Sequence, residues 1–309
     1  MEEVYLGIDM GGTQIKMGLV NGMGELLGTE MLPAKSDLSM PVRLEELVED
    51  INRILHDKFK LLGIGIAFPG IVDYINNRIL SKYVKYTDAE NTDLNSWAKK
   101  NWNVPLVLEN DARAALMGEW QYGAGKGNDN LLMVTLGTGM GSAVLIEGKL
   151  LRGKNFIAGN LGGHMSIDFE GDKCNCGNIG CVETAGSTWA LSHNLKKLHN
   201  YKNSSLSALT TIGYKDIFSH ASKGDEIAKK LKKRSLEAWS AGIINLLHAY
   251  DPEKLIIGGG IMKSKSEIIP FIRKRVNERS WLPEDGVMIT TANQTKYAGI
   301  LGVCFLLKN

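Results

Sequence analysis

Short apolar runs separated by polar or glycine-rich stretches dominate the sequence, and they predict buried strands. These runs cover residues 4–8, 15–20, 61–68, 105–108, 131–136, 142–146, 254–257 and 287–291. Elsewhere apolar residues recur at helical spacing, as they do over residues 43–59 at Leu44, Leu47, Ile51 and Leu55. Further helices are predicted from Asp111 onward and over residues 184–199, 225–250 and 297–307. Strands that alternate with helices in this way predict an α/β fold.

Two of the predicted strand pairs enclose a turn that is rich in glycine. The first turn holds Asp9, Gly11, Gly12 and Thr13, and the second holds Gly137, Thr138 and Gly139. Glycine lets backbone N–H groups approach a phosphate closely, although a single turn of this kind is most often an ordinary hairpin. Because strand, turn and strand occur twice, we expect two duplicated lobes that face each other across a cleft.

A third glycine cluster, Gly258, Gly259 and Gly260, follows the predicted strand at residues 254–257. Pro252 ends the long helix that precedes this strand. Three residues without side chains leave room for a flat ring to lie against the backbone. A purely structural turn is the alternative, and the residues alone leave both interpretations open.

The segment from residue 158 to residue 183 holds three of the four cysteines, Cys174, Cys176 and Cys181, with His164 upstream. Thiolates and an imidazole are the ligands that tetrahedral zinc prefers. A disulfide is the alternative, but Cys174 and Cys176 flank a single residue and the third thiol would be left over. We therefore predict a structural zinc site.

Glu109, Asn110 and Asp111 stand between a short predicted strand and a predicted helix. An Asp at such a junction is most often the N-cap of the helix. A carboxylate at the end of a buried strand can also serve as a general base. On these residues alone the N-cap is the simpler interpretation.

The composition narrows the class of protein. A chain of 309 residues with 44% hydrophobic residues is long enough for two lobes with separate cores. Its net charge of +2 is too small to indicate a surface that binds nucleic acid. The basic run at residues 229–234 is interpreted as the solvated surface of a helix. We expect no signal peptide and no membrane span, because the longest apolar run, at residues 61–72, is short and broken by Pro69. The few cysteines fit a reducing cytoplasm.

The cysteine segment, HMSIDFEGDKCNCGNIGCVE, resembles the signature of the ROK family of bacterial sugar kinases and sugar-responsive repressors. That signature is Glu-x-Gly-His, a spacer and CxCGxxGCxE. The paired glycine turns resemble those of the actin-like ATPase superfamily, whose fold is similar to ribonuclease H. The resemblance implies a small N-terminal lobe at residues 1–112, rejoined by a helix at 296–309, and a larger lobe with the zinc loop at 113–295.

The resemblance also implies roles for individual residues. Asp111 would accept the proton of the sugar hydroxyl. The residues implied to bind the sugar are Glu109, Asn110, Gly70, Asn160, His164 and Glu183. The residues implied to bind the nucleotide are Asp9 on the magnesium side, then Gly11, Gly12, Thr13, Lys16, Gly137, Thr138, Gly139, Gly258, Gly259 and Gly260. His164, Cys174, Cys176 and Cys181 would hold zinc.

The function implied is a cytoplasmic, ATP-dependent kinase that phosphorylates the 6-hydroxyl of a hexose or hexoside. ATP, Mg²⁺ and structural Zn²⁺ are its expected cofactors. A sugar and ATP are its expected partners, without nucleic acid or membrane, and a homodimer is expected because dimers are common in the family.

The sequence departs from the family pattern at three places. The Gly-Glu-x-Gly-His segment is replaced by one in which Gly159 is followed by Asn160, so that Glu became Asn with one residue inserted or the loop is rebuilt. The region 81–95, with Tyr83 and Tyr86, lacks the usual Pro-Asn-Leu. Arg113 stands where the family usually has Asn. An altered loop near the sugar C1 favours a β-glucoside such as cellobiose, or glucose, with allose and N-acetylmannosamine as alternatives.

Two other classes of protein compete with the kinase. ROK repressors carry a helix-turn-helix before the first strand, and that strand is expected here from about Val4, which favours the kinase. A sugar-binding protein without turnover is the other possibility. The intact Glu109-Asn110-Asp111 argues against it, and the altered loop at Asn160 keeps it open.

Overall fold

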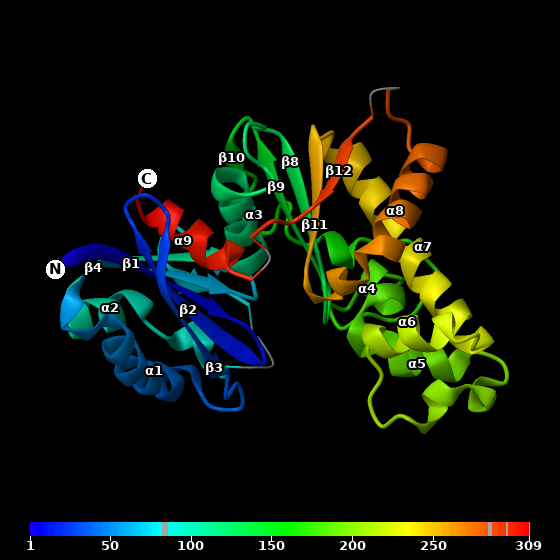
Figure 1. Ribbon diagram of the computed structural model, residues 1–309, viewed down its shortest axis with the longest axis horizontal. Helices are drawn as coiled ribbons and strands as arrows, with labels where there is room; N and C mark the ends of the chain where they lie inside the picture. The colour runs from blue at the N-terminus through cyan, green and yellow to red at the C-terminus, as the bar shows by residue number, and fades with distance from the viewer. Residues whose placement is uncertain (82–85, 284–285, 295, 309) are drawn as a thin grey trace. The chain divides into compact units, whose positions relative to one another are not determined.

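The computed structural model describes residues 1–81, 86–283, 286–294 and 296–308. The chain forms two compact units (Figure 1). Unit 1 comprises Met1–Gly127, Arg152–Ala158 and Asn293–Asn309, and unit 2 comprises Asn128–Leu151 and Gly159–Ala292. Each unit has its own buried hydrophobic core, as the chain length predicted.

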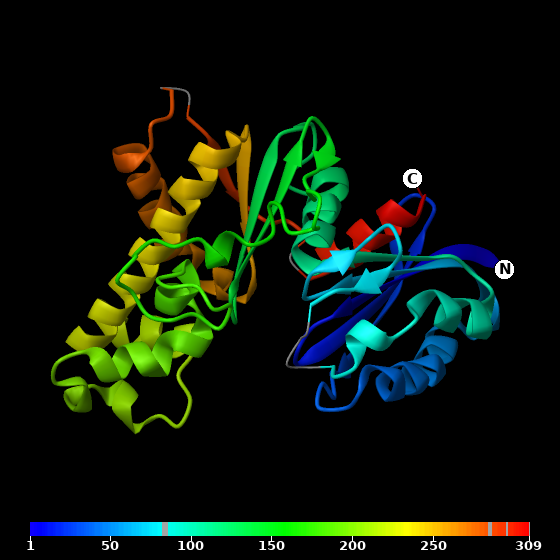
Figure 2. The same cartoon turned by 180° about the vertical axis from the view of Figure 1, so that it is seen from behind.

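Unit 1 is built on a five-stranded sheet in the order β3-β2-β1-β4-β7. The strands are β1 (Glu2–Met10), β2 (Gln14–Asn21), β3 (Leu26–Pro33), β4 (Phe59–Phe68) and β7 (Leu106–Asn110), and the short pair β5 (Val72–Asp73) and β6 (Arg78–Ile79) stands apart. The helices are α1 (Met40–Leu55), α2 (Leu94–Trp102), α3 (Asp111–Tyr122) and α9 (Ala298–Lys308). Helix α1 lies on one face of the sheet and α9 on the other (Figures 1 and 2).

Unit 2 repeats this arrangement with a sheet in the order β10-β9-β8-β11-β12. The strands are β8 (Leu131–Leu136), β9 (Met140–Ile146), β10 (Lys149–Leu150), β11 (Lys254–Gly258) and β12 (Met288–Thr291). The helices are α4 (Val182–Gly186), α5 (Leu191–Lys197), α6 (Tyr214–Ser222), α7 (Glu226–Tyr250) and α8 (Lys265–Arg279). In both units an antiparallel hairpin leads the sheet, and its first strand then pairs in parallel with later strands. The predicted duplication is therefore present in the topology.

The boundary between the units differs from the predicted one at residues 112–113. Helix α3 belongs to unit 1 because it packs directly on α9. The two backbones come so close that a side chain at Gly118 would strike the Ala298 carbonyl, and one at Gly302 would strike the Ala114 carbonyl. The separate return of residues 152–158 to unit 1 was not predicted.

The helix predicted over residues 184–199 is broken into α4 and α5. Gly186 ends α4, and its carbonyl accepts hydrogen bonds from the buried Trp239 Nε1 at 2.7 Å and from the Tyr214 hydroxyl at 2.8 Å. Because this carbonyl is used by side chains of other helices, it is not available to a continuing helix. Tertiary contacts therefore override the local helical pattern here.

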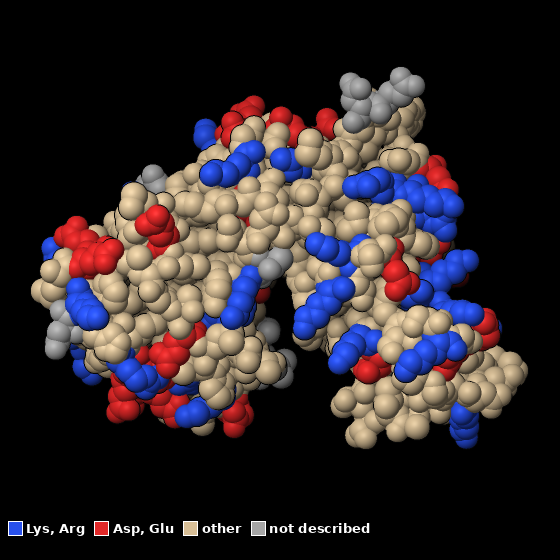
Figure 3. Space-filling model, viewed as in Figure 1, with Lys and Arg blue, Asp and Glu red and all other residues tan. Residues whose placement is uncertain are grey.

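Lysines of the basic run of α7 form ion pairs with acidic side chains, and the face of the molecule in Figure 3 shows side chains of both charges. Lys229 contacts Glu226 at 2.7 Å, and Lys232 contacts Glu267 of α8 at 2.6 Å. This is the pattern of a solvated helix with surface ion pairs. Within the described residues, no helix combines the length and the apolar character that crossing a membrane requires.

Candidate active site

Asp111 is the first residue of α3, directly after β7, and a different residue caps this helix. Asn110 is the N-cap, since its Oδ1 accepts hydrogen bonds from the N–H groups of Ala112 at 3.1 Å and Arg113 at 3.2 Å. The structural interpretation of Asp111 as an N-cap is therefore wrong, and its carboxylate is left for another task.

Asp111 is held in one orientation by its neighbours. Its Oδ1 accepts hydrogen bonds from Asn110 Nδ2 at 3.1 Å and from the Ala112 N–H at 2.8 Å. Among the described residues both bonds fall on Oδ1, which leaves Oδ2 as the oxygen that can take a proton. Burial, and then the negative charge of Asp9, raise the pKa of Asp111 to about 7.

Asp9 and Lys16 face each other across the first hairpin. They are direct partners in the β1–β2 register, and Lys16 Nζ lies 2.8 Å from Asp9 Oδ2. The turn between them is fixed from outside, because the Tyr86 hydroxyl donates to the Gly11 carbonyl at 2.8 Å and the Ser36 hydroxyl donates to the Gly12 carbonyl at 3.0 Å. Thr13, at the tip of this turn, is exposed.

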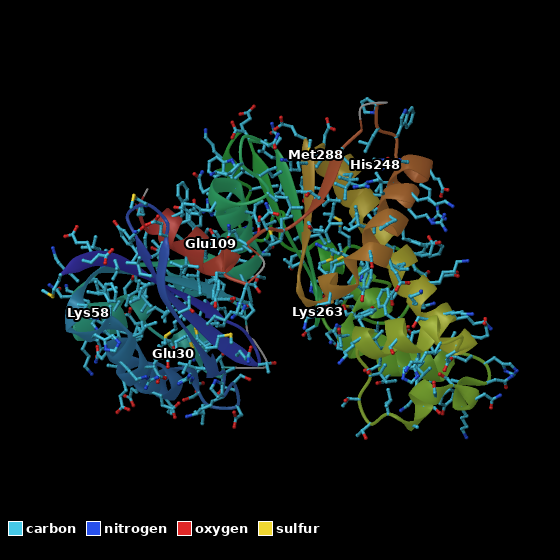
Figure 4. All side chains as sticks on the ribbon, viewed as in Figure 1. Glu30, Lys58, Glu109, His248, Lys263 and Met288 are labelled. Carbon is cyan, nitrogen blue, oxygen red and sulfur yellow. The ribbon has the colours of Figure 1, made fainter. Side chains whose placement is uncertain are left out.

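The side chains of Asn110 and Glu109, which are predicted to bind the sugar, are both buried and make contacts within the protein. Asn110 is 6% exposed, and besides capping α3 it donates to the Gly70 carbonyl at 3.0 Å. Glu109, labelled in Figure 4, is 1% exposed and its carboxylate binds Arg152 at 2.8 Å. Glu109 Oε1 also accepts a hydrogen bond from the Asn110 N–H at 2.9 Å. Both side chains therefore support Asp111, and the Glu109 carboxylate is engaged by Arg152 on one oxygen and by the Asn110 N–H on the other.

Arg113 is a buried neighbour of this junction whose contacts the sequence did not reveal. Its side chain is fully buried, 3.7 Å from Glu109, and it donates to the carbonyls of Phe156 at 3.0 Å and Ala158 at 2.7 Å. Phe156 has a φ of 60°, a conformation that aromatic residues rarely adopt. Arg113 thus holds a strained segment of chain beside the β7–α3 junction.

The aromatic residues beside this segment complete the cluster. Arg152 lies 4.0 Å from the centre of the Tyr74 ring, and Phe156 meets the same ring edge-on at 5.9 Å. A planar guanidinium stacks well on an aromatic face. Arg152 is therefore fixed on both sides, by Tyr74 and by Glu109.

The glycine turn of unit 2 is built as predicted and is held by the chain that follows the cysteines. The Gly137 N–H donates to the Gly139 carbonyl at 2.9 Å, and Thr138 is exposed at the tip. Glu183 accepts a hydrogen bond from the Met140 N–H at 2.8 Å and one from Trp189 Nε1 at 3.3 Å. The carboxylate predicted to bind sugar therefore has contacts with the turn.

The third glycine cluster begins at Gly258, the last residue of β11, and runs into the short 3-10 helix Gly260–Ser264, which carries Lys263 (labelled in Figure 4). Gly259 has a φ of 98° and lies against the backbone of Leu136, so no side chain fits at this position. Gly259 and Gly260 are both exposed. The cluster thus forms a stretch of bare backbone at the end of the strand.

The four predicted zinc ligands lie together. Their ligand atoms all fall within 4.8 Å of one another. Cys174 Sγ is 3.6 Å from His164 Nδ1, and Cys176 Sγ is 3.6 Å from Cys181 Sγ. Tetrahedral zinc, with Zn–S of about 2.3 Å and Zn–N of about 2.0 Å, places its ligands about 3.5–3.8 Å apart. These residues fit that ion.

Two thiols of this cluster, Cys174 and Cys181, ionise less readily than a free cysteine when no cation is bound. Burial raises the pKa of Cys174, and burial with the neighbouring thiols raises the pKa of Cys181 to about 12. Gly180, with a φ of 65°, lies so close to the Asp168 carbonyl that only glycine fits in the loop. The fold thus brings three sulfurs together at an electrostatic cost that a bound cation would relieve.

The loop that departs from the family pattern is anchored by Ser142 of β9. The Ser142 hydroxyl donates to the Gly159 carbonyl at 2.7 Å and accepts from the Gly162 N–H at 2.9 Å. Between these anchors, Asn160 is 8% exposed, and its Oδ1 has no partner among the described residues. Leu161, 36% exposed, stands three residues before His164, where the family pattern has Glu. Of the region 81–95, residues 82–85, including Tyr83, lie outside the described part of the chain.

Comparisons with known proteins identify the family. The sequence profile of the ROK family matches residues 5–309. The glucokinase of Thermotoga maritima is 31% identical over 98% of this chain and 96% of that protein. The xylose repressor of Bacillus subtilis is 30% identical over 89% of this chain and 68% of that protein.

A solved structure extends the likeness to the fold. The ROK family glucokinase of Streptomyces griseus, in complex with glucose and AMPPNP, superposes with a TM-score of 0.81 at 27% identity, over 98% of each chain. The two α/β units with their repeated hairpins have the actin-like ATPase fold of the ROK sugar kinases. The chain therefore belongs to the ROK family.

Proposed function

We propose that this protein is a kinase that transfers the γ-phosphoryl group of ATP to the 6-hydroxyl of a hexose or hexoside. The observation that carries the proposal is the Asp111 carboxyl. It is oriented by Asn110 and Ala112, and its pKa is raised to about 7. A general base works best when its pKa lies near the working pH.

Asp111 acts as the base of this reaction. An alcohol has a pKa far above neutrality, so the carboxylate does not deprotonate it in advance and takes its proton as the new O–P bond forms. The phosphoryl group leaves ADP as that bond is made, and the product is a sugar 6-phosphate. Most of the remaining catalysis comes from positioning and charge stabilisation.

The nucleotide is assigned to the glycine turns. In unit 1 the turn at Gly11, Gly12 and Thr13 offers backbone N–H groups, a hydroxyl and the Lys16 ammonium to phosphate oxygens. In unit 2 the turn around Thr138 offers the same kind of contacts, and the bare backbone at Gly258, Gly259 and Gly260 suits the adenine ring. Bound Mg²⁺ supplies positive charge to the phosphates, and Asp9 is the carboxylate that would hold it.

The zinc site is proposed to be structural, because protein fills all four ligand positions. His164 turns Nδ1 toward Cys174, which leaves Nε2 as the nitrogen that can meet a sugar hydroxyl. The unpartnered Oδ1 of Asn160 is an acceptor that a sugar hydroxyl can satisfy. Glu183 has one further lone pair on each carboxylate oxygen for the same purpose.

A β-glucoside such as cellobiose, or glucose, is the proposed substrate. Asn160 is neutral, and Leu161 places an exposed apolar side chain in the family's Glu register. Neither residue offers the carboxylate that a free anomeric hydroxyl would prefer, so a substituent at C1 is tolerated. Allose and N-acetylmannosamine are the competing substrates.

The test is a panel of sugars with ATP and Mg²⁺, read by ADP release and by NMR assignment of the phosphorylated carbon. We expect ADP release that depends on the sugar and a product phosphorylated at C6, with cellobiose or another β-glucoside giving the highest kcat/KM. Turnover confined to free hexoses would remove the glucoside preference. Sugar binding by calorimetry without turnover would favour a regulator like the xylose repressors instead.

A further inference from the structure

The glycine turn of unit 2 is enclosed by one short segment, Glu183 to Trp189. Glu183 accepts the Met140 N–H at 2.8 Å, where the turn enters β9. The Thr188 hydroxyl donates to the Gly137 carbonyl at 2.9 Å, where the turn leaves β8. The two ends of the turn are therefore gripped by two side chains that stand five positions apart.

The contact between this turn and Glu183 leaves no room for an added side chain. A methyl group at Gly139 would collide with the Glu183 carboxylate. One at Gly163 would collide with the Met140 carbonyl and reach Glu183 Cγ at 3.0 Å. Glycine at both positions lets the turn lie against Glu183 and against the chain beside the zinc ligand His164.

We infer that Glu183 and Thr188 are positioning residues for the phosphate-binding turn, so that the zinc loop stabilises the nucleotide site as well as any sugar site. This inference rests on the proposed function. Glu183 lies two residues after the zinc ligand Cys181. Its Oε2 accepts a hydrogen bond from the Trp189 indole N–H at 3.3 Å. A carboxylate fixed in this way orients the Met140 amide and the Gly137–Gly139 backbone before the nucleotide arrives, which lowers the cost of ordering them on binding.

The experiment measures KM for ATP and KM for the sugar separately, and AMPPNP binding by calorimetry without sugar. Thr188→Val removes the hydroxyl and keeps the shape. Thr92→Val is the matched control, since the Thr92 hydroxyl makes the same kind of bond to the Asp88 carbonyl at 2.9 Å in unit 1.

We expect Glu183→Ala to weaken ATP and AMPPNP binding roughly tenfold and Thr188→Val to weaken it roughly fivefold, because each removes a hydrogen bond that orders the turn. Thr188→Ser, which restores the donor, should recover most of the loss.

A double-mutant cycle isolates the contact between Glu183 and the turn. Gly139→Ala should weaken AMPPNP binding strongly in the wild-type background and much less in the Glu183→Ala background, because the collision is then gone. Additive effects would overturn the inference. So would a Glu183→Ala enzyme that loses sugar affinity alone while Thr188→Val keeps its ATP affinity. Absence of ATP turnover in the wild-type protein would instead count against the proposed function.

Discussion

The two units repeat one arrangement of strands, yet different side chains hold their glycine turns. In unit 1 the turn is fixed by neutral hydroxyls, Tyr86 on Gly11 and Ser36 on Gly12, and the charges Asp9 and Lys16 stay at its base. In unit 2 a hydroxyl, Thr188 on Gly137, holds one end of the turn, and a carboxylate, Glu183 on the Met140 N–H, holds the other. The repeated topology therefore fixes the position of each turn, whereas the surrounding side chains decide which charges lie beside it.

We propose that unit 1 supplies the catalytic base. Unit 1 combines the half-buried Asp111, whose pKa lies near 7, with the negative charge of Asp9. Unit 2 carries the four zinc ligands and the clamped turn. We therefore expect substitutions in unit 1 to affect kcat most, and substitutions in unit 2 to affect metal content, stability and nucleotide affinity.

The largest effect is expected at Asp111. Asp111→Asn keeps an acceptor for the Ala112 N–H but cannot take a proton, so kcat should fall by about 10²–10⁴-fold with little change in sugar KM. Asp93→Asn is the control, because Asp93 caps α2 and carries no proposed catalytic role. Steady-state kinetics on both variants measure this, and an unchanged kcat for Asp111→Asn would remove the residue from its role.

The next largest effect is expected in the zinc loop. Cys181→Ser should lose the bound metal and lower the free energy of unfolding by several kcal/mol, since structural zinc contributes about 10–16 kcal/mol in zinc-finger peptides. Cys304→Ser is the matched control, because Cys304 is a buried thiol on α9 of unit 1. Metal analysis and thermal unfolding decide the matter. Equal metal content in both variants would contradict the zinc site.

A third effect is expected at the buried ion pair of unit 1. Arg113→Met removes the positive charge beside Glu109 and the hydrogen bonds to the carbonyls of Phe156 and Ala158. The free energy of unfolding should therefore fall by about 3–5 kcal/mol. The exposed Arg53→Met, which breaks a surface pair with Glu30, should cost far less stability. Urea unfolding of the two variants gives both numbers. Equal losses would mean that Arg113 does not hold the segment.

The smallest effect is expected at the helix cap of α7. Burial opposes its ionisation, but hydrogen bonds from the Ala228 N–H and the Ser204 hydroxyl hold the pKa of Asp225 at about 2. Asp225→Ala should cost about 1 kcal/mol at pH 7. Because the folded-state pKa lies below the ordinary 3.8, that stabilisation is present above pH 4 and is lost as the pH falls through about 2. Unfolding of the wild type and the variant at pH 7 and pH 3 tests this trend. An equal difference in unfolding free energy between the two proteins at both pH values would contradict it.

Part of the fold could be predicted from the sequence, and so could the grouping of four candidate metal ligands. Apolar runs located most of the long strands but not β3, and the spacing of His164 and the cysteines predicted the cluster that the structure brings together, because these patterns are local. The partners of Glu109 could not be predicted, since Arg152 lies 43 positions away and only the return of residues 152–158 to unit 1 brings it close. The residues alone favoured Asp111 as the N-cap, whereas Asn110 has that position. Both residue types are good caps, and only the observed bonds distinguish them.

The pH dependence of kcat/KM for the sugar tests the role of Asp111 most directly. The ordinary pKa of an Asp is 3.8 and the environment raises that of Asp111 to about 7, so the base should be protonated in much of the enzyme below neutrality. We predict that kcat/KM rises about tenfold per pH unit below that value, levels off above it, and loses this step in Asp111→Asn. A rate that stays level from pH 5 to pH 8, or a step that survives in the variant, would show that another group takes the proton.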